Sequence, residues 1–249
     1  MIAKLSLSTA FLALSFLTIF GCNGVFSGSG DDMPCLTCPD SYYEPSSSSR
    51  QSVVIPGVSV SHGGETYETV VIGTQTWFKR NLNYNPSTGT SVCYNNESSN
   101  CSTYGRLYDW STAMGLDASC NSTFCSGQVN AKHRGICPSG WHIPNDDDWN
   151  ILMDAIGGSS TAGGYLKATS GWNSGGNGED TYGFSALPGG YGSSGGGFSS
   201  AGDFGSWWSA SENSSHGAYG RYVYYYYEDE DYNFSLNKSF LHSVRCVQD

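Results

Sequence analysis

An apolar run near the start of the chain is followed by a long polar stretch. Residues 5–20 are mostly Leu, Phe, Ala, Ile, Ser and Thr without charge, and Lys4 precedes them. A run of this length is typical of a signal peptide or of a membrane-anchoring helix. From residue 24 to about residue 62, Ser, Gly, Pro and Asp dominate. Such a segment buries too little apolar surface to offset its ordering entropy, so a flexible tether is predicted over residues 22–62.

Two segments before residue 120 have the spacing of regular secondary structure. Residues 65–78 hold two runs of β-branched and aromatic residues on either side of Gly73, which predicts a β-hairpin. Within residues 104–116, apolar side chains recur every three or four positions, at Leu107, Trp110, Ala113 and Met114. This spacing predicts a short helix whose one apolar stripe packs against a sheet.

The clearest local signal is a helix that begins after Asn145. Asn145 is a good N-cap residue, and the three aspartates that follow it lie where the helix dipole favours negative charge. The apolar side chains of this segment share one face and are Trp149, Leu152, Met153 and Ile156. Capping and the helix dipole account for the three carboxylates without a metal or an acid–base pair.

Glycine and serine dominate residues 163–205, but aromatic side chains are spread through them. Disordered segments rarely carry so many rings, so we expect ordered loops here. The tyrosine-rich run 222–227 then predicts a strand, the acidic run 228–231 a turn that leads into another strand, and the apolar run 243–247 a buried last strand.

Composition narrows the class of protein. Only 13% of the 249 residues are charged, whereas 33 residues are glycine and 14% are aromatic. This balance excludes coiled coils and helical bundles, and it favours a loop-rich fold with an aromatic core. The formal net charge of −11 repels phosphate backbones, so nucleic acid is not expected as a partner.

The end of the first apolar run indicates where the protein goes. Residues 19–22 read Ile-Phe-Gly-Cys and resemble the bacterial lipobox, in which removal of the signal leaves an acylated cysteine as the first residue. The resemblance implies a signal peptide at residues 1–21 and a lipid anchor at Cys22. Asn23 differs from the aspartate of inner-membrane retention signals, so the outer membrane or cell surface is expected. An ordinary signal peptide and an uncleaved helix are the alternatives.

The remaining cysteines indicate an oxidising compartment. Without Cys22 they form an even set of eight: Cys35, Cys38, Cys93, Cys101, Cys120, Cys125, Cys137 and Cys246. Eight cysteines can pair in about a hundred ways, and the sequence alone does not choose among them. Short spacing favours Cys93–Cys101 and Cys120–Cys125, with Cys137–Cys246 as the long closure. The Cys35–Cys38 spacing matches a redox motif, but no βαβ pattern surrounds it, so a local disulfide is the simpler interpretation.

Six motifs lie in order along residues 65–249. They are residues 71–77 (Val-Ile-Gly-Thr-Gln-Thr-Trp), 81–82 (Asn-Leu), 104–108 (Tyr-Gly-Arg-Leu-Tyr), 135–144 (Gly-Ile-Cys-Pro-Ser-Gly-Trp-His-Ile-Pro), 182–190 (Tyr-Gly-Phe-Ser-Ala-Leu-Pro-Gly-Gly) and 243–247 (Ser-Val-Arg-Cys-Val). Together they closely resemble the Fibrobacter succinogenes major paralogous domain, a family of largely secreted or lipid-anchored bacterial proteins of unassigned activity. The resemblance implies one folded domain over residues 63–249.

A more distant resemblance concerns the formylglycine-generating enzymes and the C-type-lectin-like fold. It lies in residues 141–144 (Trp-His-Ile-Pro), the helix of Trp149, the Gly-rich loops and the closing Val-Arg-Cys strand. It implies an α+β, C-type-lectin-like fold with a small twisted antiparallel sheet, two short helices and long Gly-rich, disulfide-stapled loops. No cysteine lies between Cys137 and Cys246 to match the late copper-binding pair of those enzymes, so their oxidase activity is not expected. The calcium-binding motifs of sugar-binding C-type lectins are absent too.

Aromatic side chains are the best binding candidates, because flat rings stack on the faces of sugars. The candidates are Trp172, Trp207, Trp208 and the run 222–227, with Tyr224 and Tyr226 foremost. The opposing interpretation is that a chain poor in aliphatic residues builds its core from these rings.

Calcium is the one metal for which the sequence offers donors. Asn177, Glu179 and Asp180 place hard oxygen ligands in a Gly-rich loop, although a solvated acidic turn explains them equally. No other cofactor is expected.

These observations predict a non-catalytic, lipid-anchored surface protein whose domain binds a glycan or a fibre or envelope component. Its partners are then the membrane, through the lipid, and a polysaccharide or envelope protein. An enzyme of unassigned activity on a formylglycine-generating-enzyme-like scaffold and a structural envelope protein are the alternatives.

Overall fold

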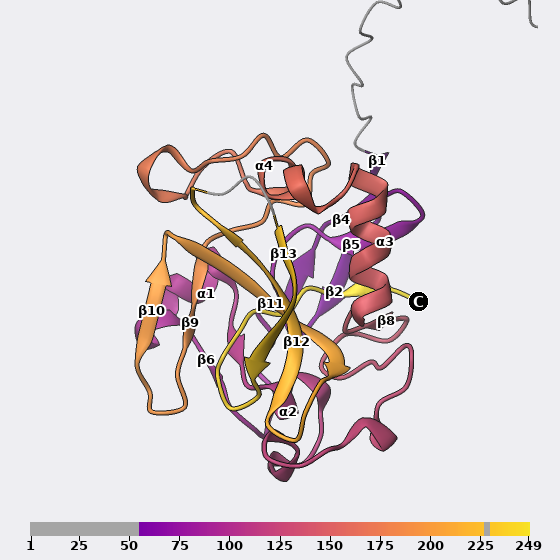
Figure 1. Cartoon of the computed structure of the whole chain (residues 1–249), viewed down its shortest axis with the longest axis vertical. Coiled ribbons are helices and arrows are strands. Elements are labelled where there is room, and N and C mark those ends of the chain that lie inside the picture. Colours follow the sequence, from indigo (N-terminus) through magenta and orange to yellow (C-terminus); the bar gives the residue numbers. More distant parts are fainter. Residues whose placement is uncertain (1–54, 227–229) are drawn as a thin grey trace, which may run out of the picture. The chain divides into compact units, whose positions relative to one another are not determined.

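The computed structural model describes residues 55–226 and 230–249, which form short strands, short helices and long loops (Figure 1). The helices are α1 (Ser98–Tyr104), α2 (Trp110–Met114), α3 (Asp146–Ile156) and α4 (Ala162–Leu166). The strands are β1 (Ile55–Pro56), β2 (Val60–His62), β3 (Glu65–Tyr67), β4 (Thr69–Ile72), β5 (Gln75–Phe78), β6 (Ser91–Val92), β7 (Leu107–Tyr108), β8 (Trp141–His142), β9 (Gly189–Gly192), β10 (Phe198–Ala201), β11 (Phe204–Glu212), β12 (Gly217–Tyr224), β13 (Glu230–Asn237) and β14 (Val247–Gln248). The architecture is α+β with small antiparallel sheets, as predicted, but the described residues hold four α-helices rather than two.

The first sheet has the strand order β1-β4-β5-β14-β8. Its β4–β5 hairpin pairs Thr69 with Phe78 and Ile72 with Gln75, which confirms the hairpin predicted in this segment. Gly73 makes the turn with a φ of 60°, and a Cβ there would lie 2.6 Å from the Cβ of Ala155 on α3. The turn therefore needs glycine both for its left-handed backbone and for the approach of the helix.

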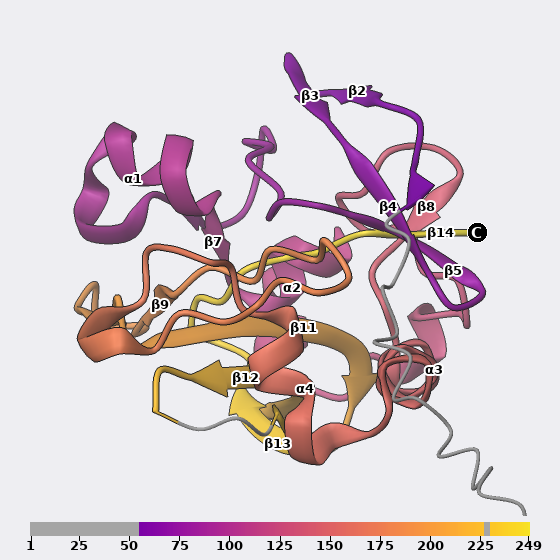
Figure 2. The same ribbon diagram turned by 90° about the horizontal axis from the view of Figure 1, so that it is seen from above.

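The second sheet has three longer strands in the order β11-β12-β13. β9 lies beside β11, and Figures 1 and 2 show the β9–β10 hairpin next to this sheet. Residues 222–224 lie in β12, which confirms a strand at the start of the tyrosine-rich run. Tyr227 and the first two residues of the acidic run, Glu228 and Asp229, lie outside the described part of the chain, and β13 begins at Glu230.

Helix α3 forms where the sequence predicts it. The Asn145 side chain accepts a hydrogen bond from the Asp148 backbone N–H at 3.0 Å, and the Asp148 carboxylate accepts one from the Asn145 N–H at 3.0 Å. This capping box starts the helix, and Gly157 ends it in a left-handed conformation. The four apolar side chains of its predicted stripe are all buried.

The predicted helix over residues 104–116 is wrong in its first half. Tyr104 ends α1, and Leu107 and Tyr108 form the strand β7, paired with β6. The helix starts only after Asp109, whose carboxylate caps it by accepting from the Thr112 N–H at 2.8 Å. Both Leu107 and Tyr108 are buried. In an extended chain two neighbouring side chains point to opposite sides, and different parts of the fold can cover each of them. A helix with one apolar stripe would leave one of the two exposed.

The predicted tether, residues 22–62, includes residues that belong to the folded domain. Residues 55–56 pair with β4, and residues 60–62 pair with β3 to form a hairpin that projects from the first sheet (Figure 2). The predicted signal peptide, the anchor residue Cys22 and the Cys35–Cys38 pair lie outside the described residues. In the described part of the chain, none of the helices has the length and apolar character that crossing a membrane requires.

All three disulfides predicted within the described domain are present. They are Cys93–Cys101, Cys120–Cys125 and Cys137–Cys246. The first two close short loops, and the third joins residues separated by 109 positions.

Two clusters of buried side chains form the core, and both are rich in aromatic rings. On β5, Trp77 belongs to one cluster and its neighbour Phe78 to the other. The same division holds on β11 for Trp207 and Trp208. Adjacent strand residues point to opposite faces, so these strands lie between the two clusters and contribute to both.

A buried arginine, Arg245, joins the last segment of the chain to the segment after β5 and to the loop of Phe184. Arg245 is fully buried and donates hydrogen bonds to the side-chain oxygen of Asn81 and to the carbonyl of Phe78, at 2.8 and 3.0 Å. Its guanidinium also lies 4.3 Å from the centre of the Phe184 ring. Burial lowers the pKa of Arg245 to about 9, so the group stays protonated at neutral pH and holds three segments together.

The pairing of His142 makes stability depend on pH. Its Nδ1 lies 2.8 Å from a carboxylate oxygen of Asp249, and its Nε2 lies 3.2 Å from one of Asp148. Burial acts to lower the pKa of His142, but hydrogen bonds and charges of the two carboxylates outweigh it, so the net pKa is raised. A raised pKa in the folded state stabilises the domain below the unfolded value of about 6.5, and this stabilisation is lost as pH rises through the folded value.

We therefore expect the variant His142→Gln to lose more stability at pH 5.5 than at pH 8.5. The measurement is the difference in the free energy of unfolding between the two proteins at each pH. Other histidines contribute equally to both proteins, so the difference isolates His142. A difference that stays constant across this range would contradict the assignment.

Candidate functional site

A hollow lined by aromatic rings lies beside the second sheet, and we call it the aromatic groove. Its volume is about 410 Å³, and its lining residues are Tyr191, Phe204, Phe234, Ser235, Leu236, Asn237, Phe240 and His242. They come from β9, β11, β13 and the segment that follows β13. Backbone bridges between Gly192 and Leu241 and between Trp207 and Ser243 hold that segment next to β9 and β11.

The rings of the groove are arranged around Tyr191. The planes of Tyr191 and Phe240 are nearly parallel, at 6°, with their centres 6.2 Å apart, and Phe204 stands edge-on to Tyr191 at 6.0 Å. Tyr222 supports the far side, because its ring contacts both Phe204 and Phe234. Phe234 is 48% exposed. The groove is thus lined by rings that are partly exposed to solvent.

His242 is the polar residue held most firmly in the groove. Its Nδ1 lies 2.7 Å from the hydroxyl of Ser206, and its ring meets that of Trp208 edge-on at 4.8 Å. Its Nε2 has no hydrogen-bond partner among the residues that the structure describes. Burial lowers the pKa of His242 to about 3, so the imidazole is neutral and the lining of the groove carries no charge at neutral pH.

The three tryptophans predicted as ligand contacts are buried. Trp172, Trp207 and Trp208 are 5%, 2% and 0% exposed. Their indole N–H groups donate to Ala186 O, Asn81 Oδ1 and Tyr108 O respectively. These rings cannot present a face to a ligand, because they fill the core of a domain that has few aliphatic residues. The opposing interpretation, that these rings build the core, is correct.

The two predicted tyrosines lie in different places. Tyr224 is half-buried and contacts Phe204 edge-on at 5.8 Å, so it borders the aromatic groove. Tyr226 is 56% exposed and lines a separate hollow with Asn177 and Glu179. The two tyrosine rings contact each other at 4.8 Å.

The predicted calcium donors make hydrogen bonds within the loop. Asn177 accepts from the Trp172 N–H, and Glu179 accepts from the Thr181 hydroxyl. Asp180 accepts from the N–H and the hydroxyl of Ser185, each at 2.6 Å. Over residues 55–226 and 230–249, no group of three or more His, Cys, Asp or Glu side chains is placed to hold a metal ion. In the structure the two carboxylates accept hydrogen bonds from nearby residues of the chain.

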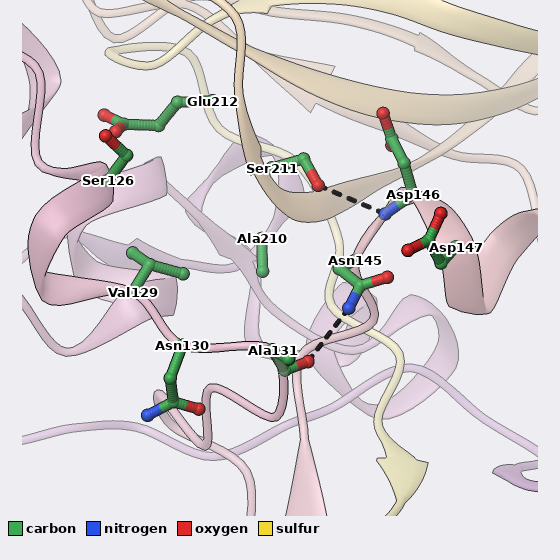
Figure 3. Close-up of a pocket in the computed structure, with 10 residues that line it drawn as sticks. All are labelled: Ser126, Val129, Asn130, Ala131, Asn145, Asp146, Asp147, Ala210, Ser211 and Glu212. Atoms are coloured by element: carbon green, nitrogen blue, oxygen red, sulfur yellow. Dashed lines mark hydrogen bonds between the residues drawn. The ribbon is translucent and has the colours of Figure 1, made fainter.

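A further hollow of about 270 Å³ lies at the start of α3 (Figure 3). Three carboxylates line it, from Asp146, Asp147 and Glu212. The Asp146 carboxylate accepts from Ser209 at 3.0 Å and pairs with buried Arg221, and Glu212 pairs with Lys238. Figure 3 shows that the Ser211 hydroxyl accepts a hydrogen bond from the backbone N–H of Asp146. Two of the three carboxylates are thus used to hold the fold together.

Sequence reasoning missed the residues of the aromatic groove. Tyr191 stands alone among glycine and serine residues, and Phe240 lies beside Leu241 in a short stretch without a regular alternation, so no local pattern marks either residue. One signal was available in residues 232–236, which read Tyr-Asn-Phe-Ser-Leu and alternate as a half-buried strand does. It would have placed Phe234 on one face of a strand.

Comparison with known proteins identifies the family but no individual relative. Neither the curated proteins nor the solved structures contain a significant match to the chain. The family model of the Fibrobacter succinogenes major domain matches residues 70–248, which is well over half of the chain. The match spans the first sheet except β1 and the first residue of β4, and it includes the second sheet, the aromatic groove and the Cys137–Cys246 disulfide. The chain therefore belongs to the Fibrobacter succinogenes major domain family.

Proposed function

We propose that the domain binds uncharged carbohydrate in the aromatic groove. The observation that carries the proposal is the set of partly exposed rings around a hollow of about 410 Å³. The C–H faces of sugar rings are flat and apolar, so they bury well against aromatic faces, while their hydroxyls reach polar groups at the edges. The volume lies in the range of small-molecule sites, about 300–1,000 Å³.

The polar lining supports a neutral ligand. Ser235, Asn237 and His242 are the polar members, and none of them is charged at neutral pH. A charged ligand would lose hydration without meeting an opposite charge, which costs free energy. Hydroxyl groups can both donate to and accept from these side chains. Neutral polysaccharide is therefore favoured over acidic polysaccharide.

The proposal also covers the cellular location and the fold class of the domain. We place it at the outer membrane or cell surface, attached through lipid at Cys22, and we assign its architecture to the C-type-lectin-like class. The apolar run of residues 5–20, the lipobox-like residues 19–22 and the disulfides, which persist in oxidising compartments, support this location. A protein anchored at this surface would present the aromatic groove to extracellular polysaccharide.

The test is retention on insoluble cellulose, hemicellulose and peptidoglycan, followed by calorimetry with soluble fragments of any polymer that retains the protein. We expect Tyr191→Ala and Phe240→Ala each to weaken binding about tenfold, which corresponds to about 1.4 kcal/mol. Each variant removes one of the two parallel rings. Tyr226→Ala is the matched control, because Tyr226 is an exposed tyrosine outside the groove.

Two outcomes would overturn the proposal. One is that no polymer retains the native protein. The other is that the groove variants, shown to be folded by their unfolding transitions, bind as tightly as the native protein. Substitution of Trp172 or Trp207 cannot serve as the test, because those rings are buried and their loss would unfold the core.

A further inference from the structure

A polar hollow lies beside the segment that follows β13, on the side of that segment that faces away from the aromatic groove. Two hollows of about 300 and 360 Å³ share the residues Thr90 and Asp109. Ser239 and Leu241 line the first of them, whereas Phe240 and His242 line the aromatic groove. Alternate residues of this extended segment therefore face different cavities. We call the joined hollows the Asp109 hollow.

The Asp109 side chain is buried and has one oxygen without a partner. The residue is 8% exposed. Its Oδ1 accepts from the Thr112 N–H at 2.8 Å and from the Ser111 hydroxyl at 3.1 Å. Its Oδ2 makes no hydrogen bond and no ion pair within the part of the chain that the structure describes. This oxygen opens onto the hollow, where it is free to accept a hydrogen bond from a ligand.

The charge of the Asp109 hollow is negative. Asp109 and Asp117 are among its lining residues, and no Lys, Arg or His is. Asn121 adds a donor: its Oδ1 accepts from the Ser111 N–H at 2.9 Å, and its amide N–H₂ group has no partner among the residues that the structure describes. The Ser239 hydroxyl lies in the same hollow. A cationic donor beside a hydroxyl group matches this arrangement.

We propose that the Asp109 hollow binds a hydroxylated primary amine of monosaccharide size, such as an amino sugar with a free ammonium group. The ammonium donates to Asp109 Oδ2, and a neighbouring ligand hydroxyl accepts from Asn121. A charge-assisted hydrogen bond to a buried carboxylate is stronger than a neutral one. The site is distinct from the aromatic groove, so this inference does not rest on carbohydrate binding there.

The donor set favours an organic cation over a metal ion. Calcium takes about six to eight oxygen ligands, usually including several carboxylates. Asp109 is the single buried carboxylate among the lining residues of the hollow, since Asp117 is exposed. An ammonium group needs only three acceptors, which one carboxylate oxygen and nearby hydroxyls can supply.

The experiment titrates the folded chain with glucosamine at pH 6, where the amine is protonated, and compares it with glucose and N-acetylglucosamine. We expect glucosamine to bind at least tenfold more tightly than either neutral sugar, with an affinity that falls as NaCl is added. Asp109→Asn should remove this preference. Because asparagine caps helices as well as aspartate does, its melting temperature should stay near that of the native protein.

Further variants separate this site from the others. Phe240→Ala changes the aromatic groove and should keep the preference for glucosamine. Thr90→Tyr fills the position that the two hollows share and should abolish binding even if Asp109→Asn does not fold. Equal binding of the three sugars, or an unchanged preference in Thr90→Tyr, would overturn the inference. Calcium that competes with glucosamine and depends on Asp109 would show a metal site instead.

Discussion

Replacement of both Cys137 and Cys246 by alanine is expected to lower the free energy of unfolding by about 5 kcal/mol. The disulfide closes a loop of 109 positions, and the loss of unfolded-chain entropy grows with loop length. Both cysteines are buried. Cys246 directly precedes β14, and Cys137 lies shortly before β8, so the bond also fixes the two strands that complete the first sheet.

The two short disulfides are matched controls for this effect. The same entropy relation gives about 2.5 kcal/mol for Cys93–Cys101 and about 2 kcal/mol for Cys120–Cys125, whose sequence separations are 8 and 5. The measurement is chemical denaturation of three paired Cys→Ala variants. Equal losses in the free energy of unfolding for all three variants would show that loop length does not determine how much each disulfide stabilises the domain.

The elements that the sequence predicted well are those whose causes are local. Helix α3 depends on Asn145, three aspartates and an apolar stripe that all lie within twelve residues. The β4–β5 hairpin depends on Gly73 between two β-branched runs. Short cysteine spacings limit the geometry of the short disulfides in the same way. In each case the interacting residues are close in sequence, so their pattern is visible before folding.

The binding residues were predicted poorly because exposure is decided by distant contacts. Trp207 and Trp208 are adjacent, aromatic and in a strand, which fits a binding surface and a core equally. They are buried because α3 and β5 cover one face of β11, and β7 and α2 cover the other. The aromatic groove is built from four separate segments, and Tyr191 meets Phe240 only through a bridge between residues 49 positions apart. No short window of sequence contains that relation.

Replacement of Lys238 by methionine is expected to lower the free energy of unfolding by about 3–5 kcal/mol. Lys238 is fully buried, and its ammonium pairs with the Glu212 carboxylate. It also donates to the carbonyls of Cys120, Thr123 and Ser215, at 3.1, 3.1 and 3.2 Å. The ammonium also lies 4.6 Å from the centre of the Trp110 ring. Removing it leaves the Glu212 charge buried without its counter-charge, together with carbonyls that have lost a donor.

Two variants distinguish loss of the charge pair from loss of packing. Lys79→Met breaks the exposed pair with Glu68 and is expected to cost less than about 1 kcal/mol, because water screens that pair. Adding Glu212→Leu to Lys238→Met removes the unpaired charge, so the double variant should recover part of the lost stability. The remaining deficit reflects the three carbonyls that lose the ammonium and the Cys125 N–H that loses the Glu212 carboxylate as its acceptor. Denaturation curves of the native protein and the three variants decide the matter: if the double variant is no more stable than Lys238→Met, the two side chains do not act as a pair.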